Sequence, residues 1–125
     1  MVTKLSFDNS SEDCFINGAS LASVTSIWEQ EFLTTLAFGK HAWIGGHNRN
    51  EEKRFVWLTG EDGPQGFYDN FKPGSPTQTS GHNCIQMNGK DGAWKNVDCN
   101  KKMFHFCQKE SSVDANSKYS YQQNR

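Results

Sequence analysis

The sequence predicts a single α+β domain, with two helices followed by several short antiparallel strands. Helix-forming patterns occur up to Gly39, and after them come short apolar runs separated by turn residues. Four cysteines are spread over the 125 residues, which favours a fold held together by covalent links. A chain of this length forms one hydrophobic core and is too short for two comfortable domains.

The composition argues against two classes of partner. The net charge is -1, so there is no excess of lysine and arginine to neutralise phosphates, and no nucleic-acid partner is expected. No apolar run approaches the ~20 residues that cross a bilayer, so membrane insertion is not expected. Four tryptophans and nine phenylalanines provide the buried area for a modest core.

Residues 26–39 predict a helix of about three turns. Ser26 and Glu29 form a capping-box pair at its start, and Gly39 is suited to its end. The apolar residues between them are Ile27, Trp28, Phe32, Leu33, Leu36 and Ala37. A weaker helix is predicted at residues 7–17, with Cys14 and Phe15 facing inward.

Short strands are predicted at residues 42–46, 54–58, 83–87, 93–97 and 103–108. Asn88-Gly89, between the third and fourth runs, indicates a tight turn. Residues 59–81 contain all three prolines and almost no periodicity, and they predict an ordered loop, because long irregular segments of compact domains are usually functional. We expect residues 1–110 to form the domain and the polar residues 111–125 to form a disordered C-terminal tail.

The cysteines have no Cys-x-x-Cys spacing, so their even number favours disulfides over zinc or thiol redox chemistry. Of the three pairings we favour Cys84–Cys99 with Cys14–Cys107, because the first brackets a hairpin and the second ties an early element to the last strand. Buried free thiols of a cytosolic protein are the alternative. The first 14 residues do not resemble a signal peptide, so secretion requires that one has been removed or that the chain is incomplete.

Several ordered motifs resemble a C-type lectin-like domain over residues 5–109. They are "GASLASVTSIWEQEFLTTL", "WIGG", "FVWLTGEDG", "YDNFKPGSP", "CIQMNGKDGAWKNVDC" and "FHFC". The resemblance implies two helices, small antiparallel sheets, a long loop region, two disulfides that match the favoured pairing, and a secreted or extracellular setting. It also implies that Trp43 and Ile44 are structural core residues.

The family usually has a further strand before the first helix, which pairs with the last strand. Only residues 1–4 precede Leu5 here, so we expect this N-terminal strand to be truncated. The edge of the sheet is then either exposed or covered by the C-terminal tail.

In calcium-dependent members of the family, acidic and amide side chains hold one calcium ion, whose remaining positions take sugar hydroxyls. The matching positions here are Ser75, Thr77, His82, Lys95 and Asn96, and none of them carries a carboxylate. Calcium takes six to eight oxygen ligands, and Lys95 places an ammonium group among them. The resemblance therefore implies a ligand-binding surface at these five residues, with no metal and no cofactor.

The predicted function is recognition of a protein or glycan at the long-loop face without calcium. One alternative is a structural or matrix domain that forms a homo-oligomer through the sheet edge. Another is calcium-independent binding of acidic or sulfated carbohydrate by Lys72, His82 and Lys95. Enzymatic activity is not expected, because the sequence has no nucleophile elbow, zinc-protease helix or phosphate loop.

Overall fold

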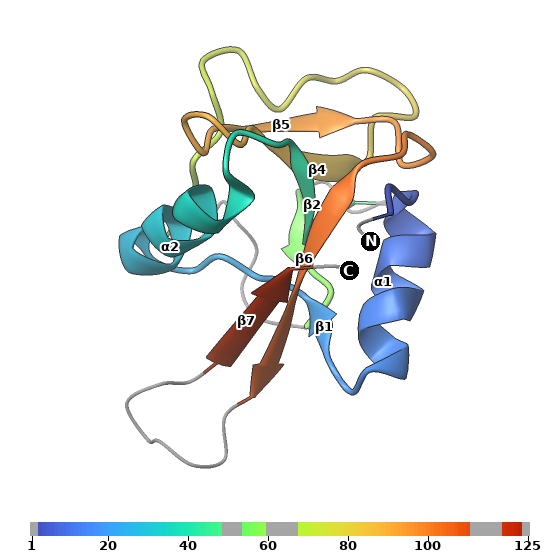
Figure 1. Cartoon of the computed structure of the whole chain (residues 1–125). Helices are drawn as coiled ribbons and strands as arrows, with labels where there is room; N and C mark the ends of the chain where they lie inside the picture. Colours follow the sequence, from blue (N-terminus) through green and yellow to red (C-terminus); the bar gives the residue numbers. More distant parts are fainter. Residues whose placement is uncertain (1–2, 49–53, 60–67, 111–118, 124–125) are drawn as a thin grey trace.

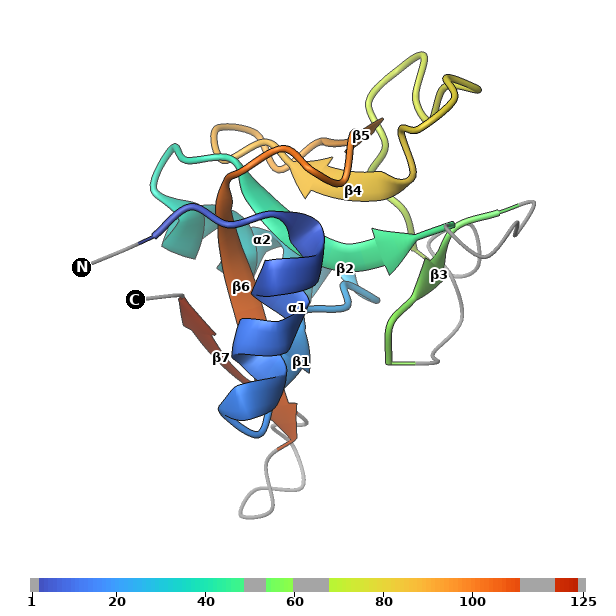
Figure 2. The same cartoon turned by 90° about the vertical axis from the view of Figure 1, so that its right-hand side faces the viewer.

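The computed structural model describes residues 3–48, 54–59, 68–110 and 119–123. Its elements are α1 (Phe7–Ile16), β1 (Ser20–Leu21), α2 (Ile27–Ala37), β2 (Ala42–His47), β3 (Val56–Trp57), β4 (Cys84–Met87), β5 (Trp94–Val97), β6 (Phe104–Glu110) and β7 (Tyr119–Gln123). The two helices lie on opposite sides of the central strands β2 and β6, as the two views show (Figures 1 and 2). The predicted α+β class with two helices is confirmed.

The sheet is mixed: the expected antiparallel pairs are present, together with one parallel pair. The strand order is β1-β6-β2-β4-β5, with β3 beside β2 and β7 beside β6. Strand β6 runs parallel to β2, with Phe104 opposite Ala42. The other pairs are antiparallel. A parallel pair requires a long crossover connection, and the chain between β2 and β6 provides it by way of β4 and β5.

Strand β7 corrects the prediction of a disordered tail at residues 119–123. It pairs antiparallel with β6, from Phe106 opposite Gln123 to Glu110 opposite Tyr119. Backbone hydrogen bonds to an open strand edge do not require apolar side chains, so the polar composition was misleading. Of the two predicted alternatives, the edge is thus covered by the tail, and self-assembly through it would require displacement of β7. Residues 111–118 lie outside the described part of the chain.

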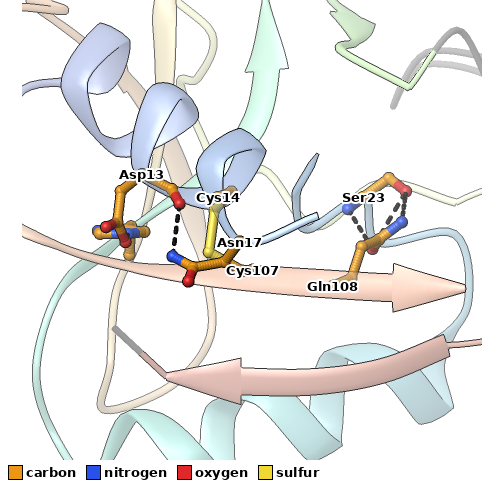
Figure 3. Close-up of a disulfide and its surroundings, with 7 residues drawn as sticks. Asp13, Cys14, Asn17, Ser23, Cys107 and Gln108 are labelled. Atoms are coloured by element: carbon orange, nitrogen blue, oxygen red, sulfur yellow. Dashed lines mark hydrogen bonds and ion pairs between the residues drawn. A yellow bond between two sulfur atoms is a disulfide. The ribbon is translucent and has the colours of Figure 1, made fainter. Parts of the chain in front are cut away.

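Helix α1 is fastened to the last strands by a disulfide between Cys14 and Cys107 (Figure 3). The other disulfide joins Cys84 and Cys99, so the favoured pairing is confirmed. The inward orientation predicted for Phe15 is wrong, because its side chain is 78% exposed. Cys14 occupies the inward position, and the next residue lies ~100° further around the helix.

Helix α2 begins as predicted, with the Ser26 hydroxyl accepting from the Glu29 N–H. The Glu29 carboxylate does not return to the Ser26 N–H; it accepts from the N–H and the hydroxyl of Thr25. The helix ends with Phe38 and Gly39 in the left-handed conformation. Gln30, Leu33 and Ala37 form its buried side.

The connection between β4 and β5 contains the predicted turn residues Asn88 and Gly89. Residues 88–93 form it, and the Asn88 N–H donates to the Ala93 carbonyl. Its glycine with positive φ is Gly92 rather than Gly89. Gly89 is needed for a different reason, because a Cβ there would lie 2.1 Å from the Lys40 carbonyl oxygen.

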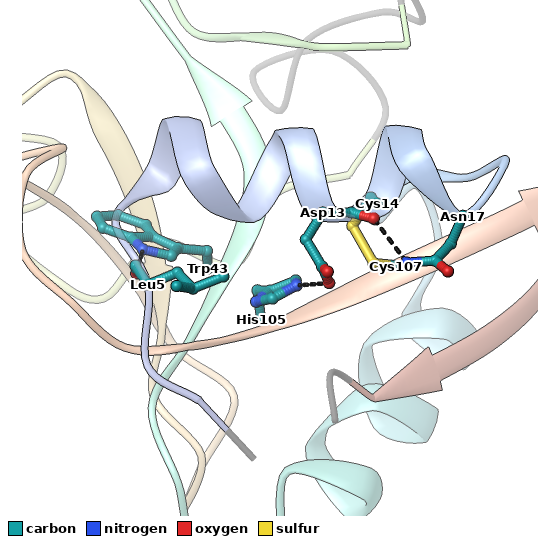
Figure 4. Close-up of polar contacts among 7 residues, drawn as sticks. All are labelled: Leu5, Asp13, Cys14, Asn17, Trp43, His105 and Cys107. Atoms are coloured by element: carbon teal, nitrogen blue, oxygen red, sulfur yellow. Dashed lines mark hydrogen bonds and ion pairs between the residues drawn. A yellow bond between two sulfur atoms is a disulfide. The ribbon is translucent and has the colours of Figure 1, made fainter. Parts of the chain in front are cut away.

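Two hydrophobic clusters form the core, on the two faces of β4 and β5. Ile85, Met87 and Trp94 belong to the cluster that packs against α2 and the loops. Cys84 and Val97 belong to the cluster that includes Phe7 of α1. The predicted core role of Trp43 and Ile44 is confirmed, since both side chains are fully buried. Trp43 also donates from Nε1 to the Leu5 carbonyl, which holds Leu5 against β2 (Figure 4).

Candidate functional site

The long-loop cavity is a concave space of about 540 Å³ beside residues 76–83. Its lining is mostly uncharged and polar, and it includes Asn48, Thr77, Gln78, Thr79, Ser80 and Asn83. The aromatic ring of Phe55 contributes an apolar wall. The described residues of this lining offer both hydrogen-bond donors and acceptors, and none of them carries a fixed charge.

The loop around this cavity is held in place by the Asn96 side chain on β5. Asn96 Oδ1 accepts from the Thr77 N–H at 2.9 Å. Its Nδ2 donates to the carbonyl oxygens of Thr77 at 3.0 Å and His82 at 2.9 Å. The side chain is only 5% exposed, and its amide is satisfied by the two ends of the loop. Asn96 is therefore a positioning residue of the cavity.

The start of the loop is anchored to β5 through its backbone. The Lys72 N–H donates to the Trp94 carbonyl, and the Trp94 N–H donates to the Asn70 carbonyl. Phe71, between them, packs edge-on against Trp94 at a centroid distance of 5.5 Å. The peptide bond between Ser75 and Pro76 is cis. The backbone bonds and the ring contact hold the start of the loop against β5.

The structure places only some of the five predicted site residues at the cavity. Thr77 and His82 line it, and Asn96 holds it from below. Ser75 and Lys95 are not part of the lining. Lys95 pairs with Gln86 of β4, and its side chain points to the other face of β5 from Asn96 because successive side chains alternate.

The alternative anion site of Lys72, His82 and Lys95 is not assembled at this cavity either, since neither lysine lines it. Asn48, Thr79 and Asn83 also line the cavity, and these hydroxyl and amide groups were not predicted. Alternating Thr77 and Thr79 is a local pattern that points to shared hydrogen bonding, and their hydroxyls lie 2.9 Å apart. The position of Asn48 depends on its backbone bond to Asn83 and has no local pattern.

A second group of interest is Cys14, His105 and Cys107, whose ligand atoms lie within 4.8 Å of one another. The two sulfurs form a disulfide and cannot act as thiolate ligands, so the group is not a metal site of the zinc type. His105 Nε2 lies 3.0 Å from Asp13 Oδ2 (Figure 4). Burial lowers the pKa of His105, although the hydrogen bond and charge of Asp13 oppose this shift.

A family model described as Lectin C-type domain matches residues 3–109. The chain belongs to the C-type lectin family. Its members are binding domains without enzymatic activity, which confirms the prediction that the chain is not an enzyme. No helix in the described ranges is long and apolar enough to span a membrane.

The chain is similar to the human low affinity immunoglobulin epsilon Fc receptor, with 38% identity over 84 residues. The match covers 66% of this chain and 25% of that receptor, so the chain spans about a quarter of the relative's length. The cow carbohydrate-recognition domain of CD23, solved in the presence of an oligosaccharide, has a TM-score of 0.76 and 27% identity over 85% of this chain and 80% of that one. A calcium-independent type II antifreeze protein has a TM-score of 0.77 and 24% identity over 85% and 79%, which shows a shared fold alone.

Proposed function

We propose that this C-type lectin domain is an extracellular recognition module that binds a neutral carbohydrate in the long-loop cavity without calcium. The observation that carries the proposal is the hydrogen bonding of Asn96. This side chain matches a calcium-ligand position of the family. Here its amide makes hydrogen bonds to both ends of the loop. The two disulfides support an extracellular setting, since such bonds persist in oxidising compartments.

The chemistry of the cavity argues against calcium. Asn96 Oδ1 already accepts the Thr77 N–H, and Nδ2 cannot ligate a cation. No carboxylate is among the described residues that line the cavity. Calcium sites of proteins use several charged or carbonyl oxygens to replace the hydration shell of the ion. The loop is instead held by hydrogen bonds of the neutral Asn96 side-chain amide, which do not require an ion.

The lining favours a neutral sugar over other ligands. Sugar hydroxyls both donate and accept hydrogen bonds, and the hydroxyls and amides of Thr77, Gln78, Thr79 and Asn83 do the same. Asn96 ties both ends of the loop to β5, and a loop held in this way loses less conformational freedom on binding. The cow relative was solved with an oligosaccharide present, which supports this class of ligand.

Calcium independence is tested by thermal unfolding in 10 mM calcium and in chelator. Extracellular calcium modules have dissociation constants of about 10⁻⁴ to 10⁻³ M, so a working site would be stabilised by roughly 1.4–2.7 kcal/mol. We expect superimposable unfolding curves. A stabilisation that the chelator reverses would overturn the calcium-free assignment.

The ligand class is tested on a glycan array, with and without chelator. We expect binding to neutral glycans that survives the chelator and is lost in Ser80→Tyr, which fills the cavity. Thr35→Tyr on the exposed side of α2 is the matched control and should bind normally. Binding of a protein ligand alone, or binding that Ser80→Tyr leaves unchanged, would contradict the proposal.

A further inference from the structure

A second cavity, the basic pocket, has a volume of about 300 Å³ and shares no lining residue with the long-loop cavity. Four lysines line it: Lys4, Lys40, Lys101 and Lys102. They come from three separate segments, which precede α1, follow α2 and precede β6. The fold thus gathers positive charge in one place although the net charge of the chain is -1.

These charges have no negative partner among the residues that the structure describes, since none of the four ammonium groups forms a salt bridge there. The Nζ atoms of Lys4 and Lys40 lie 5.3 and 5.5 Å from the centroid of the Phe104 ring. A ring face attracts cations, so Phe104 holds the two lysines together in the absence of a counter-charge. The positive potential of the pocket is therefore available to a ligand.

An independent observation at the pocket is the buried amide of Gln86 on β4. Its side chain is 3% exposed and lines the pocket, and its Oε1 has no hydrogen-bond partner. Buried polar atoms without a partner are uncommon and require an explanation. Oε1 is the enclosed atom of this amide, so the amide faces the pocket with its Nε2. This N–H group can donate to an acceptor in the pocket.

His41 provides another donor. Its Nδ1 accepts from the Gly89 N–H at 3.3 Å, so the neutral ring carries its hydrogen on Nε2. Lysine ammonium groups donate only, and the amide of Gln86 donates through Nε2. The polar groups of the basic pocket are thus all suited to a ligand that accepts hydrogen bonds and is negatively charged.

We propose that the basic pocket binds the sulfate group of a sulfated carbohydrate, independently of the ligand in the long-loop cavity. A volume of about 300 Å³ accommodates one sulfated sugar unit, and it is too confined for a nucleic-acid duplex. A sulfate ester presents three acceptor oxygens, which suit the donors of the pocket. This assignment stands on the pocket alone and does not depend on the proposed function.

The first test measures binding of a sulfated heparin-derived tetrasaccharide by calorimetry. We expect the double variant Lys101→Gln/Lys102→Gln to bind at least about ten-fold more weakly than the unmodified protein. The control Lys72→Gln/Lys109→Gln removes the same charge from exposed positions outside the pocket, and we expect a change of less than about two-fold. Equal weakening by both double variants would show that only overall charge matters and would overturn the proposal.

Three further binding measurements, with inorganic sulfate, with the unsulfated tetrasaccharide and with anionic vesicles, identify the source of the anion. We expect inorganic sulfate to compete with the tetrasaccharide, and the same tetrasaccharide without sulfate groups not to bind in the pocket. Failure of the sulfated tetrasaccharide to bind would overturn the proposal. Binding of the protein to vesicles with anionic lipids, but not to the tetrasaccharide, would also overturn it.

Gln86→Met separates a ligand contact from a structural role. Oε1 has no partner to lose, so we expect an unchanged or higher Tm together with at least about five-fold weaker tetrasaccharide binding. Gln30→Met is the matched control, because Gln30 is buried and its Oε1 accepts from Trp94 Nε1 at 2.8 Å. That variant should lower the Tm and leave binding intact. A lower Tm with unchanged binding in Gln86→Met would contradict the role in the pocket.

Discussion

The two cavities of this domain differ in the role of the buried β-strand amide beside each of them. At the long-loop cavity, the buried amide of Asn96 makes hydrogen bonds to both ends of the loop. At the basic pocket, the buried amide of Gln86 has an unpartnered oxygen, and the lysines have no carboxylate partner in the described part of the chain. Asn96 shapes its cavity by holding the loop, whereas Gln86 makes no such bond through its oxygen and can present its N–H group to a ligand.

The comparison predicts that the two cavities can be damaged separately, and the largest effect is expected at Gly89. In Gly89→Ala the new Cβ would overlap the backbone of Lys40, which must move. We expect the free energy of unfolding to fall by about 3 kcal/mol, the upper end of the usual range for overpacking. Because this contact positions Lys40 and His41, tetrasaccharide binding should weaken as well.

Urea unfolding and calorimetry measure the two effects of Gly89→Ala. Lys90→Ala in the same connection is the control, since Lys90 is exposed and its replacement should change the free energy of unfolding by less than about 0.5 kcal/mol. Neutral-glycan binding at the long-loop cavity should persist in both variants. Its loss in Gly89→Ala would show that the cavities are not independent.

A somewhat smaller loss of stability is expected when the amide of Asn96 is removed. Asn96→Ala leaves the Thr77 N–H and two loop carbonyls without their partner, which should cost about 2 kcal/mol. Neutral-glycan binding should be lost and tetrasaccharide binding kept, the reverse of the pattern expected for the basic pocket. Urea unfolding and both binding assays measure this, and retained neutral-glycan binding would contradict the positioning role.

His105 is a further buried side chain with an unsatisfied atom, and it lines neither of the two cavities. Its Nδ1 is buried without a partner, and burial lowers the pKa of the ring below its ordinary value of 6.5. As pH falls below 6.5, the unfolded state therefore binds a proton that the folded state does not, and stability decreases. The decrease can reach about 1.4 kcal/mol per pH unit.

The pH effect is measured by urea unfolding at several pH values between 7.5 and 5.5. His105→Gln retains a donor for Asp13 and does not titrate, so its free energy of unfolding should depend less on pH over this range. His82→Gln, at the half-buried edge of the long-loop cavity, is the comparison variant. Equal pH dependence of His105→Gln and the unmodified protein would show that another group controls the acid transition.

The comparison also explains how much the sequence could predict. Helix α2 has local capping and a regular apolar spacing, and the Cys84–Cys99 bond brackets a local turn, so both were predictable. The pairing of β7 depends on an open edge of β6, and its own polar sequence does not reveal it. The parallel pairing of β2 and β6 joins segments that are distant in the sequence.

The two cavities likewise differ in how far the sequence predicted them. Thr77, His82 and Asn96 were identified because a resemblance supplied their positions, and the structure brings them together. The basic pocket was not predicted, because its lysines are scattered from Lys4 to Lys102 and form no charge cluster in the sequence. Gln86 sits in an ordinary strand, and only its unpartnered oxygen distinguishes it.

The smallest expected effect comes from the Thr77 hydroxyl and refines the role of Asn96. Thr77 Oγ1 lies 3.3 Å from Asn96 Nδ2, longer than the bond between Nδ2 and the Thr77 carbonyl at 3.0 Å. Thr77 is exposed, so Thr77→Val should lower the free energy of unfolding by only about 0.5 kcal/mol. Urea unfolding beside Asn96→Ala tests this. If Thr77→Val were as damaging as Asn96→Ala, the loop would be held through the hydroxyl of Thr77, whereas a small effect supports anchoring through its backbone.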